Sequence, residues 1–178
     1  MSGVGATVKP QDIVERALAL SEADGCIVIA EETSEANLRF ARNTLTTNGV
    51  TRGRRLTVIA TVGGQEGTAA GVVSRSNVGL DKLESLVRAA EDAARSAPSA
   101  EDAAPLMQQR GDDPGWADEP TVTSIDVFSS VAPALGDAFT AARAGGRDLF
   151  GFAEHQISTT YLGSSTGLRV RHDQPTGR

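Results

Sequence analysis

The 178-residue sequence has little cysteine, little histidine and few aromatic residues, and each scarcity excludes a class of function. The single cysteine, Cys26, excludes a disulfide framework, and two histidines exclude a self-contained histidine-rich metal centre. A formal net charge of -6 argues against direct nucleic-acid binding, which depends on a basic surface. No apolar run approaches the roughly 20 residues that span a bilayer. The amino terminus also lacks a signal peptide, so we expect a cytoplasmic protein with no membrane partner.

What the chain does contain is typical of a globular protein. Hydrophobic residues make up 39% of it and charged residues 22%, which is too apolar for a disordered chain. Because aromatic residues are only 4%, the core has to be built mainly from aliphatic side chains and alanine. The length suits one ordinary domain, or one and a half, and is ample to bury a core.

Hydrophobic periodicity predicts an α+β fold, with a mainly antiparallel sheet flanked by amphipathic helices. Strands that are adjacent in the sequence and joined by short polar loops favour antiparallel pairing over a doubly wound parallel sheet. We expect helices at 10–23, 81–97 and 124–144, and strands at 26–30, 36–43, 55–62, 68–74, 149–153, 157–162 and 168–172.

Local signals set the expected boundaries of these elements. The polar residues 31–35 predict a break between two strands, and Asn48-Gly49 predicts a turn. The glycine-rich segment 63–67 lacks the spacing of a phosphate-binding loop and is interpreted as a hairpin. Asp81, followed three residues later by a glutamate, predicts a capped helix start. Pro133 predicts a helix that is kinked or divided in two.

An acidic, proline-interrupted connector is expected over about 98–122. A connector of this length is unusual inside a compact domain, and it indicates a surface excursion or a boundary between lobes. Trp116 is expected to anchor it onto the domain, because tryptophan buries a large apolar area. The final strand, 168–172, has nothing after it to cover its edge, so we interpret the end of the sequence as a cut.

The search for an active site finds none. His155 follows Glu154, but no second histidine lies within reach, and the sequence contains neither HExxH nor HExxxH. Cys26 lies in an aliphatic strand and is expected to be a buried structural residue. We therefore assign no catalytic residue and no metal ligand, and the substrate-binding residues stay unknown.

Two basic clusters are also present, at Arg52, Arg54 and Arg55 and at Arg169 and Arg171. Neither is interleaved with aromatic residues that could stack on bases, so solvated turn and strand faces are expected.

One segment resembles a known family. Residues 37–50, Asn-Leu-Arg-Phe-Ala-Arg-Asn-Thr-Leu-Thr-Thr-Asn-Gly-Val, are similar to the amino-terminal signature of the TldD/PmbA family, also called modulators of DNA gyrase or U62-type metallopeptidases. The order of the elements that follow matches the same family, and the segment 161–169 resembles its S-x-x-G stretch. The resemblance covers about residues 10–173 and is nearer to the PmbA/TldE-like branch.

The resemblance implies that residues 1–178 are the amino-terminal domain of such a protein, without its carboxy-terminal domain. TldD and TldE form a heterodimer that encloses a proteolytic chamber and degrades unfolded peptides. The zinc-binding HExxxH motif belongs to the TldD subunit, so the chain itself is expected to bind no cofactor and to be non-catalytic. Its implied partners are a TldD-like subunit, or a second copy by self-association, and unfolded peptides.

Two alternatives stay open. A non-enzymatic binding or adaptor module would use the face of the helix 124–144 or the acidic connector. A free-standing hydrolase would use Glu154 and His155. For Arg39, Asn43 and Asn48 a structural role is favoured over substrate contact, as strand-face solvation for the arginine and as turn or cap hydrogen bonding for the asparagines.

Overall fold

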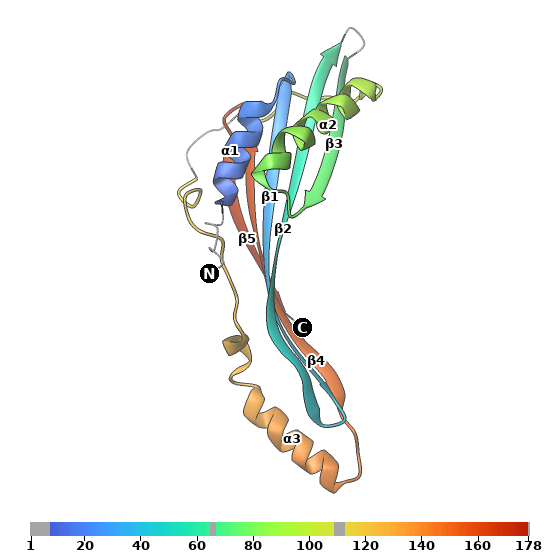
Figure 1. Cartoon of the computed structure of the whole chain (residues 1–178), viewed down its shortest axis with the longest axis vertical. Helices are drawn as coiled ribbons and strands as arrows, with labels where there is room; N and C mark the ends of the chain where they lie inside the picture. The colour runs from blue at the N-terminus through green and yellow to red at the C-terminus, as the bar shows by residue number, and fades with distance from the viewer. Residues whose placement is uncertain (1–7, 65–66, 109–112, 178) are drawn as a thin grey trace. The chain divides into compact units, whose positions relative to one another are not determined.

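The structure is a computed structural model that describes residues 8–64, 67–108 and 113–177. The elements follow one another along the chain as Figure 1 labels them. The helical elements are α1 (Pro10–Leu20), η1 (Leu80–Lys82), α2 (Leu83–Ser96), η2 (Ile125–Phe128) and α3 (Ala132–Ala144), where η marks a 3-10 helix. The strands are β1 (Gly25–Ala41), β2 (Thr44–Gly64), β3 (Gly67–Ser76), β4 (Phe150–Ser164) and β5 (Arg169–Gly177).

The strands form one five-stranded sheet in the order β3-β2-β1-β4-β5. β2 and β3 pair antiparallel, from Arg55 opposite Ser76 to Gly64 opposite Gly67. The predicted α+β class with an antiparallel sheet is confirmed. Part of the predicted hairpin loop, Gln65 and Glu66, lies outside the described residues.

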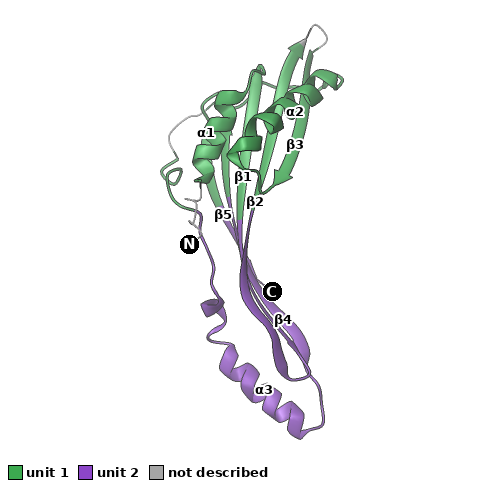
Figure 2. Ribbon diagram, viewed as in Figure 1, with its two compact units in different colours: residues 1–32, 54–119, 160–172 green, residues 33–53, 120–159, 173–178 purple. Residues whose placement is uncertain are grey.

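Contacts divide the chain into two compact units (Figure 2). Unit 1 comprises residues 1–32, 54–119 and 160–172, and unit 2 comprises residues 33–53, 120–159 and 173–178. Each unit has its own hydrophobic cluster. Among the described residues, no helix has the length and apolar character that crossing a membrane requires.

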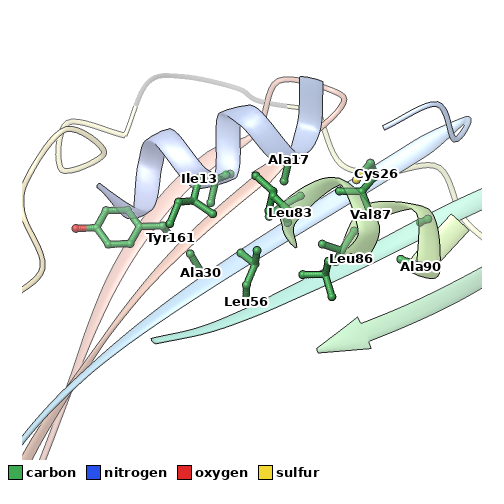
Figure 3. Packing of buried hydrophobic residues seen from close by; sticks show 14 of the residues in the cluster. Ile13, Ala17, Cys26, Ala30, Leu56, Leu83, Leu86, Val87, Ala90 and Tyr161 are labelled. Carbon is green, nitrogen blue, oxygen red and sulfur yellow. The ribbon is translucent and has the colours of Figure 1, made fainter. Parts of the chain in front are cut away.

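The core of unit 1 lies between one face of its sheet and the helices α1 and α2 (Figure 3). Every second residue of a strand points to this face, which we call the inner face. The core is aliphatic, as the composition predicts, with Tyr161 as its one aromatic member that is fully buried. The other members come from α1, β1, β2 and α2, and they are Ile13, Val14, Ala17, Cys26, Val28, Ala30, Leu56, Val58, Ala60, Leu83, Leu86, Val87, Ala90 and Ala94.

The helix α1 ends at Leu20, three residues before the predicted end. Ser21 is already extended, because the buried carboxylate of Glu91 binds the chain there. The backbone N–H of Glu22 donates to Glu91 Oε1 at 2.6 Å, and the Ser21 hydroxyl donates to the same oxygen at 3.1 Å. The carboxylate therefore replaces the hydrogen bonds that a longer helix would have made.

The predicted cap at Asp81 is wrong. Asp81 lies inside η1, and α2 starts after Lys82, which makes no side-chain cap. The 3-10 turn supplies helical backbone directly in front of α2, so the helix needs no capping side chain there.

The predicted break at 31–35 is also wrong, because β1 runs through it without interruption. Ser34 and Ala36 are buried, so the alternation of inward and outward residues continues across the segment. Glu32 is tolerated in the strand because Arg54 of β2 forms an ion pair with it. The predicted strands 149–153 and 157–162 likewise merge into the single strand β4.

The predicted turn at Asn48-Gly49 lies inside β2, and the chain reverses instead at Arg42 and Asn43. Both of these residues have positive φ, 50° and 58°, as a two-residue hairpin turn requires. Asparagine accepts this conformation more readily than most residues, and Asn43 also gains tertiary hydrogen bonds there.

The predicted helix 124–144 is divided, as Pro133 indicates. The short η2 is followed by α3, and Pro133 occupies the first turn of α3, where its missing N–H costs nothing. Unit 2 has a small core built on Ala36, Leu38 and Phe128. The ring of Phe40 packs against that of Phe139 of α3, with the centroids 5.3 Å apart.

Candidate functional site

Glu154 and His155 lie in β4 and do not form a metal site. His155 Nδ1 is 2.7 Å from the hydroxyl of Thr123, a hydrogen bond in which either atom can be the donor. Within the described residues, no three histidine, cysteine, aspartate or glutamate side chains are placed to hold a metal ion. The described residues therefore offer no ligand set for the zinc ion of a metallopeptidase.

A polar network ties residues 121–123 to the strands of unit 2. The buried hydroxyl of Thr159 accepts from the Thr121 N–H at 3.1 Å and donates to Asp173 at 2.6 Å. The Thr123 N–H donates to the Ser34 hydroxyl at 3.1 Å. With the bond to His155, these contacts show that His155 belongs to a network that holds the connector.

Within the segment 37–50, Asn43 is a buried residue with several tertiary hydrogen bonds. Only 2% of it is exposed. Its amide donates to Arg147 O at 2.8 Å, its carbonyl oxygen accepts from Leu149 N–H at 2.9 Å, and its backbone carbonyl accepts from Arg143. Asn43 thus joins the β1–β2 turn to the segment between α3 and β4, which confirms the expected turn hydrogen bonding.

Arg39 and Asn48 are exposed strand residues. The exposure of Arg39 agrees with the expected solvated strand face. Asn48 lies within β2 and not in a turn, so the turn role expected for it is wrong.

Cys26 is buried, with 1% exposed, and belongs to the inner-face core. Burial raises the pKa of its thiol, which disfavours the reactive thiolate. Its N–H donates to the hydroxyl of Ser165 at 3.0 Å. The predicted structural role agrees with this environment.

Arginines of both basic clusters form ion pairs and hydrogen bonds within the chain, which the sequence does not indicate. Arg54 binds Glu32 and the carbonyl of Val8, and the burial of Glu32 raises the pKa of its carboxyl group against the opposing effect of Arg54. Arg169 forms a two-pronged ion pair with Glu15, at 2.6 and 2.8 Å. For Arg54 and Arg169 the expectation of a solvated face is therefore wrong.

Trp116 anchors the connector on the core of unit 1, as predicted. Its ring packs against the inner-face cluster, 5.8 Å from the ring of Tyr161 in an edge-to-face arrangement. The Gln11 amide donates to Trp116 O and Asp118 O, at 2.9 and 2.8 Å. The Tyr161 hydroxyl donates to Asp118 O at 2.7 Å.

Asp113 holds the connector to the edge strand β5. The N–H groups of Arg171 and Gly115 both donate to its carboxylate, and these bonds lower the pKa of the Asp113 carboxyl group. The connector therefore satisfies part of the β5 edge, which the sequence alone predicts to be uncovered.

The strongest candidate for a functional surface in unit 2 is apolar. Phe150 and Phe152 of β4 are 64% and 56% exposed, on alternate positions and therefore on one face of the strand. Ile125, Val127 and Val131, in and directly after η2, are 41–49% exposed. We call Phe150 and Phe152 the unit 2 apolar surface. Exposed apolar groups of this kind mark interaction sites. Sequence reasoning missed the two phenylalanines, although two aromatics on alternate positions of a predicted strand are a recognisable signal.

Comparison with known proteins agrees with the resemblance in the sequence. Residues 26–97 match the family model described as PmbA/TldA metallopeptidase domain 1. No curated protein matches the chain.

Three solved structures share the fold. TldE from Thermococcus kodakarensis superposes with a TM-score of 0.61 at 11% identity, over 94% of this chain and 37% of the TldE chain. A putative modulator of a DNA gyrase from Thermotoga maritima gives 0.58 at 15% identity, over 94% of this chain and 38% of that one. A putative modulator of DNA gyrase from Bacteroides thetaiotaomicron gives 0.58 at 14% identity, over 93% and 38%. The chain thus spans less than two fifths of the length of these proteins.

Proposed function

Because residues 26–97 match the first metallopeptidase domain of the PmbA/TldD family, we propose that the chain belongs to this family and acts as the amino-terminal domain of a PmbA/TldE-like subunit in a metallopeptidase complex. The observation that carries the proposal is the match of residues 26–97 to the first metallopeptidase domain, within a fold shared with TldE over 94% of the chain. In this role the chain is cytoplasmic and supplies structure, while the chemistry belongs to its partner.

The partner proposed is a TldD-like subunit that carries the HExxxH zinc motif. The similarity to TldE, over 94% of this chain, supports this division of labour. The zinc ion would polarise the peptide carbonyl and activate water on the partner. The substrates proposed are unfolded or flexible peptides.

The unit 2 apolar surface is the part of the chain that we assign to the partner. Aromatic side chains such as Phe150 and Phe152 are enriched in protein interfaces, because they bury a large apolar area and have few rotatable bonds. Exposed apolar side chains of this size are typical of surfaces that bind another protein.

Co-expression with a TldD-like subunit tests the proposal. We expect the two chains to co-purify, zinc to depend on the HExxxH histidines of the partner, and hydrolysis of an unstructured fluorogenic peptide to require both chains. The double variant Phe150→Glu/Phe152→Glu should lower co-purification at least tenfold. The control Met107→Glu, at a residue 76% exposed on the connector, should leave it unchanged.

The second candidate, a non-enzymatic adaptor module, is favoured by the exposed residues Ile125, Val127 and Val131 at the start of the predicted helical region. The same co-expression distinguishes the two functions. An adaptor would leave the peptidase activity of the TldD-like subunit the same with and without this chain, and that result would contradict the subunit proposal.

A further inference from the structure

One segment of β2 is exposed on both of its faces. Residues 44–53 belong to unit 2 (Figure 2), and all of them except the half-buried Gly49 are exposed. A Cβ atom built on Gly49 or Gly53 would meet nothing within 4 Å. We call residues 44–53 the open strand. Its faces are not covered by any part of the chain that the structure describes.

The backbone edge of the open strand also lacks a neighbouring strand. In the sheet β2 lies between β3 and β1, but β3 pairs only with residues 55–64 of β2. Where β3 ends, the Asn77 N–H donates to Arg54 O at 2.9 Å. Within the described ranges, no strand continues this pairing along residues 44–53.

The geometry of the hairpin turn identifies the groups on this edge. The chain reverses in a two-residue turn, so the flanking residues Ala41 and Thr44 direct their backbone N–H and C=O groups at each other. These groups alternate between the two edges of a strand, so those of Leu45 and Thr47 point away from β1. Unpaired donors and acceptors in a row are a template for another extended chain.

The open strand has few of the features that protect an edge from such pairing. Proteins commonly protect edge strands with proline, lysine or other charged residues. Residues 44–53, Thr-Leu-Thr-Thr-Asn-Gly-Val-Thr-Arg-Gly, contain no proline, no lysine and no acidic residue. Their threonine and valine residues favour extended backbone. The segment therefore forms a strand readily and does not prevent another strand from pairing with it.

The edges of the sheet in unit 1 show what kind of segment covers an edge in this protein. Both are covered in part by the acidic connector. The Ala100 N–H donates to Thr68 O of β3 at 2.9 Å, and the Arg171 N–H of β5 donates to Asp113 at 2.7 Å. Over residues 98–122 the sequence has six acidic residues and one basic residue. At these two edges, then, the covering segment is acidic.

The charges around the open strand favour the same kind of segment. Arg42 in the turn, Arg52 in the strand and Arg39 on the adjacent β1 are exposed. In the part of the chain that the structure describes, none of the three forms an ion pair. Two carboxylates in neighbouring segments, those of Glu35 and Asp148, accept hydrogen bonds from asparagines. Although the chain has a net charge of -6, this edge is locally basic and would attract acidic side chains.

From these observations we infer that the open strand is a docking site that binds an extended, acidic segment of a partner protein by strand addition. Backbone groups of Leu45 and Thr47 supply the hydrogen bonds, and the three arginines supply the preference for acidic side chains. The inference goes beyond the function proposed above, which assigns no residue to peptide binding. It does not rest on that function, because docking needs neither a TldD-like subunit nor hydrolysis.

Fluorescence anisotropy with the full 178-residue chain tests the inference. The probe is a fluorescein-labelled, unstructured peptide of about nine residues, in which glutamate alternates with threonine and valine, long enough to follow most of the open strand. We expect saturable binding. A probe that is N-methylated at every residue keeps the side chains but has no backbone donors, so it should bind at least about tenfold more weakly. A probe with lysine in place of glutamate should also bind at least about tenfold more weakly.

A pair of variants at Thr47 tests the backbone contact from the side of the protein. Thr47→Pro removes an N–H group from the open edge and should weaken binding at least about tenfold. Proline is accepted on an edge strand where the N–H faces solvent, so the variant should fold, which circular dichroism and urea unfolding can verify. Thr47→Ala is the matched control. It keeps the N–H group and should bind the probe like the wild type.

A second pair of variants tests the charge preference. Arg52→Glu should weaken binding of the glutamate probe at least about fivefold, because it places a carboxylate beside acidic side chains. The control is Arg75→Glu, at an exposed arginine of β3 in unit 1, which should leave binding unchanged.

Several results would overturn the inference. Absence of binding up to about 500 µM protein would do so, as would equal binding of the N-methylated or the lysine probe. Equal weakening by Thr47→Pro and Thr47→Ala would mean that the backbone of the open strand is not the contact. Loss of binding in Phe150→Glu/Phe152→Glu but not in Thr47→Pro would place the peptide on the unit 2 apolar surface instead. Co-purification with a TldD-like subunit is a separate measurement, so the proposed function can stand or fail independently.

Discussion

At the scale of single residues, the polar side chains that sequence inspection selects as candidates for chemistry are mostly engaged in structure. Asn43 is the clearest case, and Glu91, which the sequence does not single out, is likewise buried and hydrogen-bonded. A buried polar group that is satisfied contributes modestly to stability, whereas removing its partner leaves a desolvated group and costs more. Substitutions at these two residues should therefore lower the free energy of unfolding measurably.

Asn43→Ala should destabilise the fold by about 2–3 kcal/mol, from the lost hydrogen bonds and from alanine forced to positive φ. Glycine adopts positive φ without strain, so Asn43→Gly loses only the side-chain hydrogen bonds and should lower the free energy of unfolding by about 1–2 kcal/mol. Urea unfolding measures both. Asn48 is an exposed residue of β2, so Asn48→Ala is the control and should change the free energy of unfolding by less than about 0.5 kcal/mol. Equal losses at positions 43 and 48 would contradict the role assigned to Asn43.

Glu91 should contribute stability that depends on pH. Burial by itself favours the protonated carboxyl group, but hydrogen bonds from the Glu22 N–H, Arg88 and Ser21 outweigh it and lower the pKa below the ordinary value of 4.5. A carboxyl group with a lowered pKa in the folded state stabilises the fold above pH 4.5, and this contribution is lost as the pH falls through the folded-state pKa.

Glu91→Gln should therefore lower the free energy of unfolding by about 1–3 kcal/mol at pH 7, since it removes a charged acceptor from bonded donors. The difference between wild type and variant should shrink below about pH 4. Urea titrations at several pH values check this. A difference that stays constant down to pH 3 would show that the ionised carboxylate is not what stabilises the contact.

At the scale of elements, α2 lies directly against β3 at Gly71. A Cβ atom added at Gly71 would lie within 3.0 Å of backbone atoms of Ala90, Ala93 and Ala94. Backbone cannot move aside as a flexible side chain can, so the helix would have to shift away from the strand. The small residues Gly71, Ala90 and Ala94 together let the helix lie directly on the sheet.

Gly71→Ala should consequently cost about 3 kcal/mol or more by overpacking this contact. The control is Gly53→Ala in β2, where a Cβ atom meets nothing within 4 Å and alanine should be neutral or slightly stabilising. Thermal unfolding of the two variants measures the contrast. Similar melting temperatures would mean that α2 can move away from β3 without cost.

At the scale of the whole molecule, the two units differ in how much apolar surface holds each one. Among the residues that the structure describes, the cluster of unit 1 has fifteen buried members, whereas that of unit 2 has three. The strands β1 and β4 have residues in both units, so one continuous strand is expected to differ in local stability along its length. Local opening follows the density of buried apolar contacts.

Hydrogen exchange should reveal this gradient. In β4, amides of residues 160–164 in unit 1 should exchange at least tenfold more slowly than amides of residues 150–156 in unit 2. Mass spectrometry of peptic fragments, or heteronuclear NMR, can measure the two segments in one sample. Uniform protection along β4 would indicate a single cooperative unit.

Much of the fold follows from short-range pattern. The helical spacing of apolar residues predicts α1 and α2 to within a few residues, and alternation predicts the strands. The pattern fails where a distant residue supplies what the local sequence lacks. Glu32 lies inside β1 because Arg54 pairs with it, and α1 ends early because Glu91 binds Ser21 and Glu22. Neither partner is recognisable from local spacing.

The scarcity of cysteine, histidine and aromatic residues by itself determined that the core is aliphatic and that the chain has no disulfide framework. The order of its motifs indicated the α+β class and the resemblance to the PmbA/TldD family, whose first-domain model matches residues 26–97. Only the tertiary structure decided that the turn uses Asn43 and not Asn48, and that Arg54, Arg169 and His155 serve internal contacts. It also decided which aliphatic residues of the sheet are exposed, such as Val72 and Val170. The physical reason is that periodicity specifies which residues share a face, while the neighbours that cover this face come from distant parts of the chain.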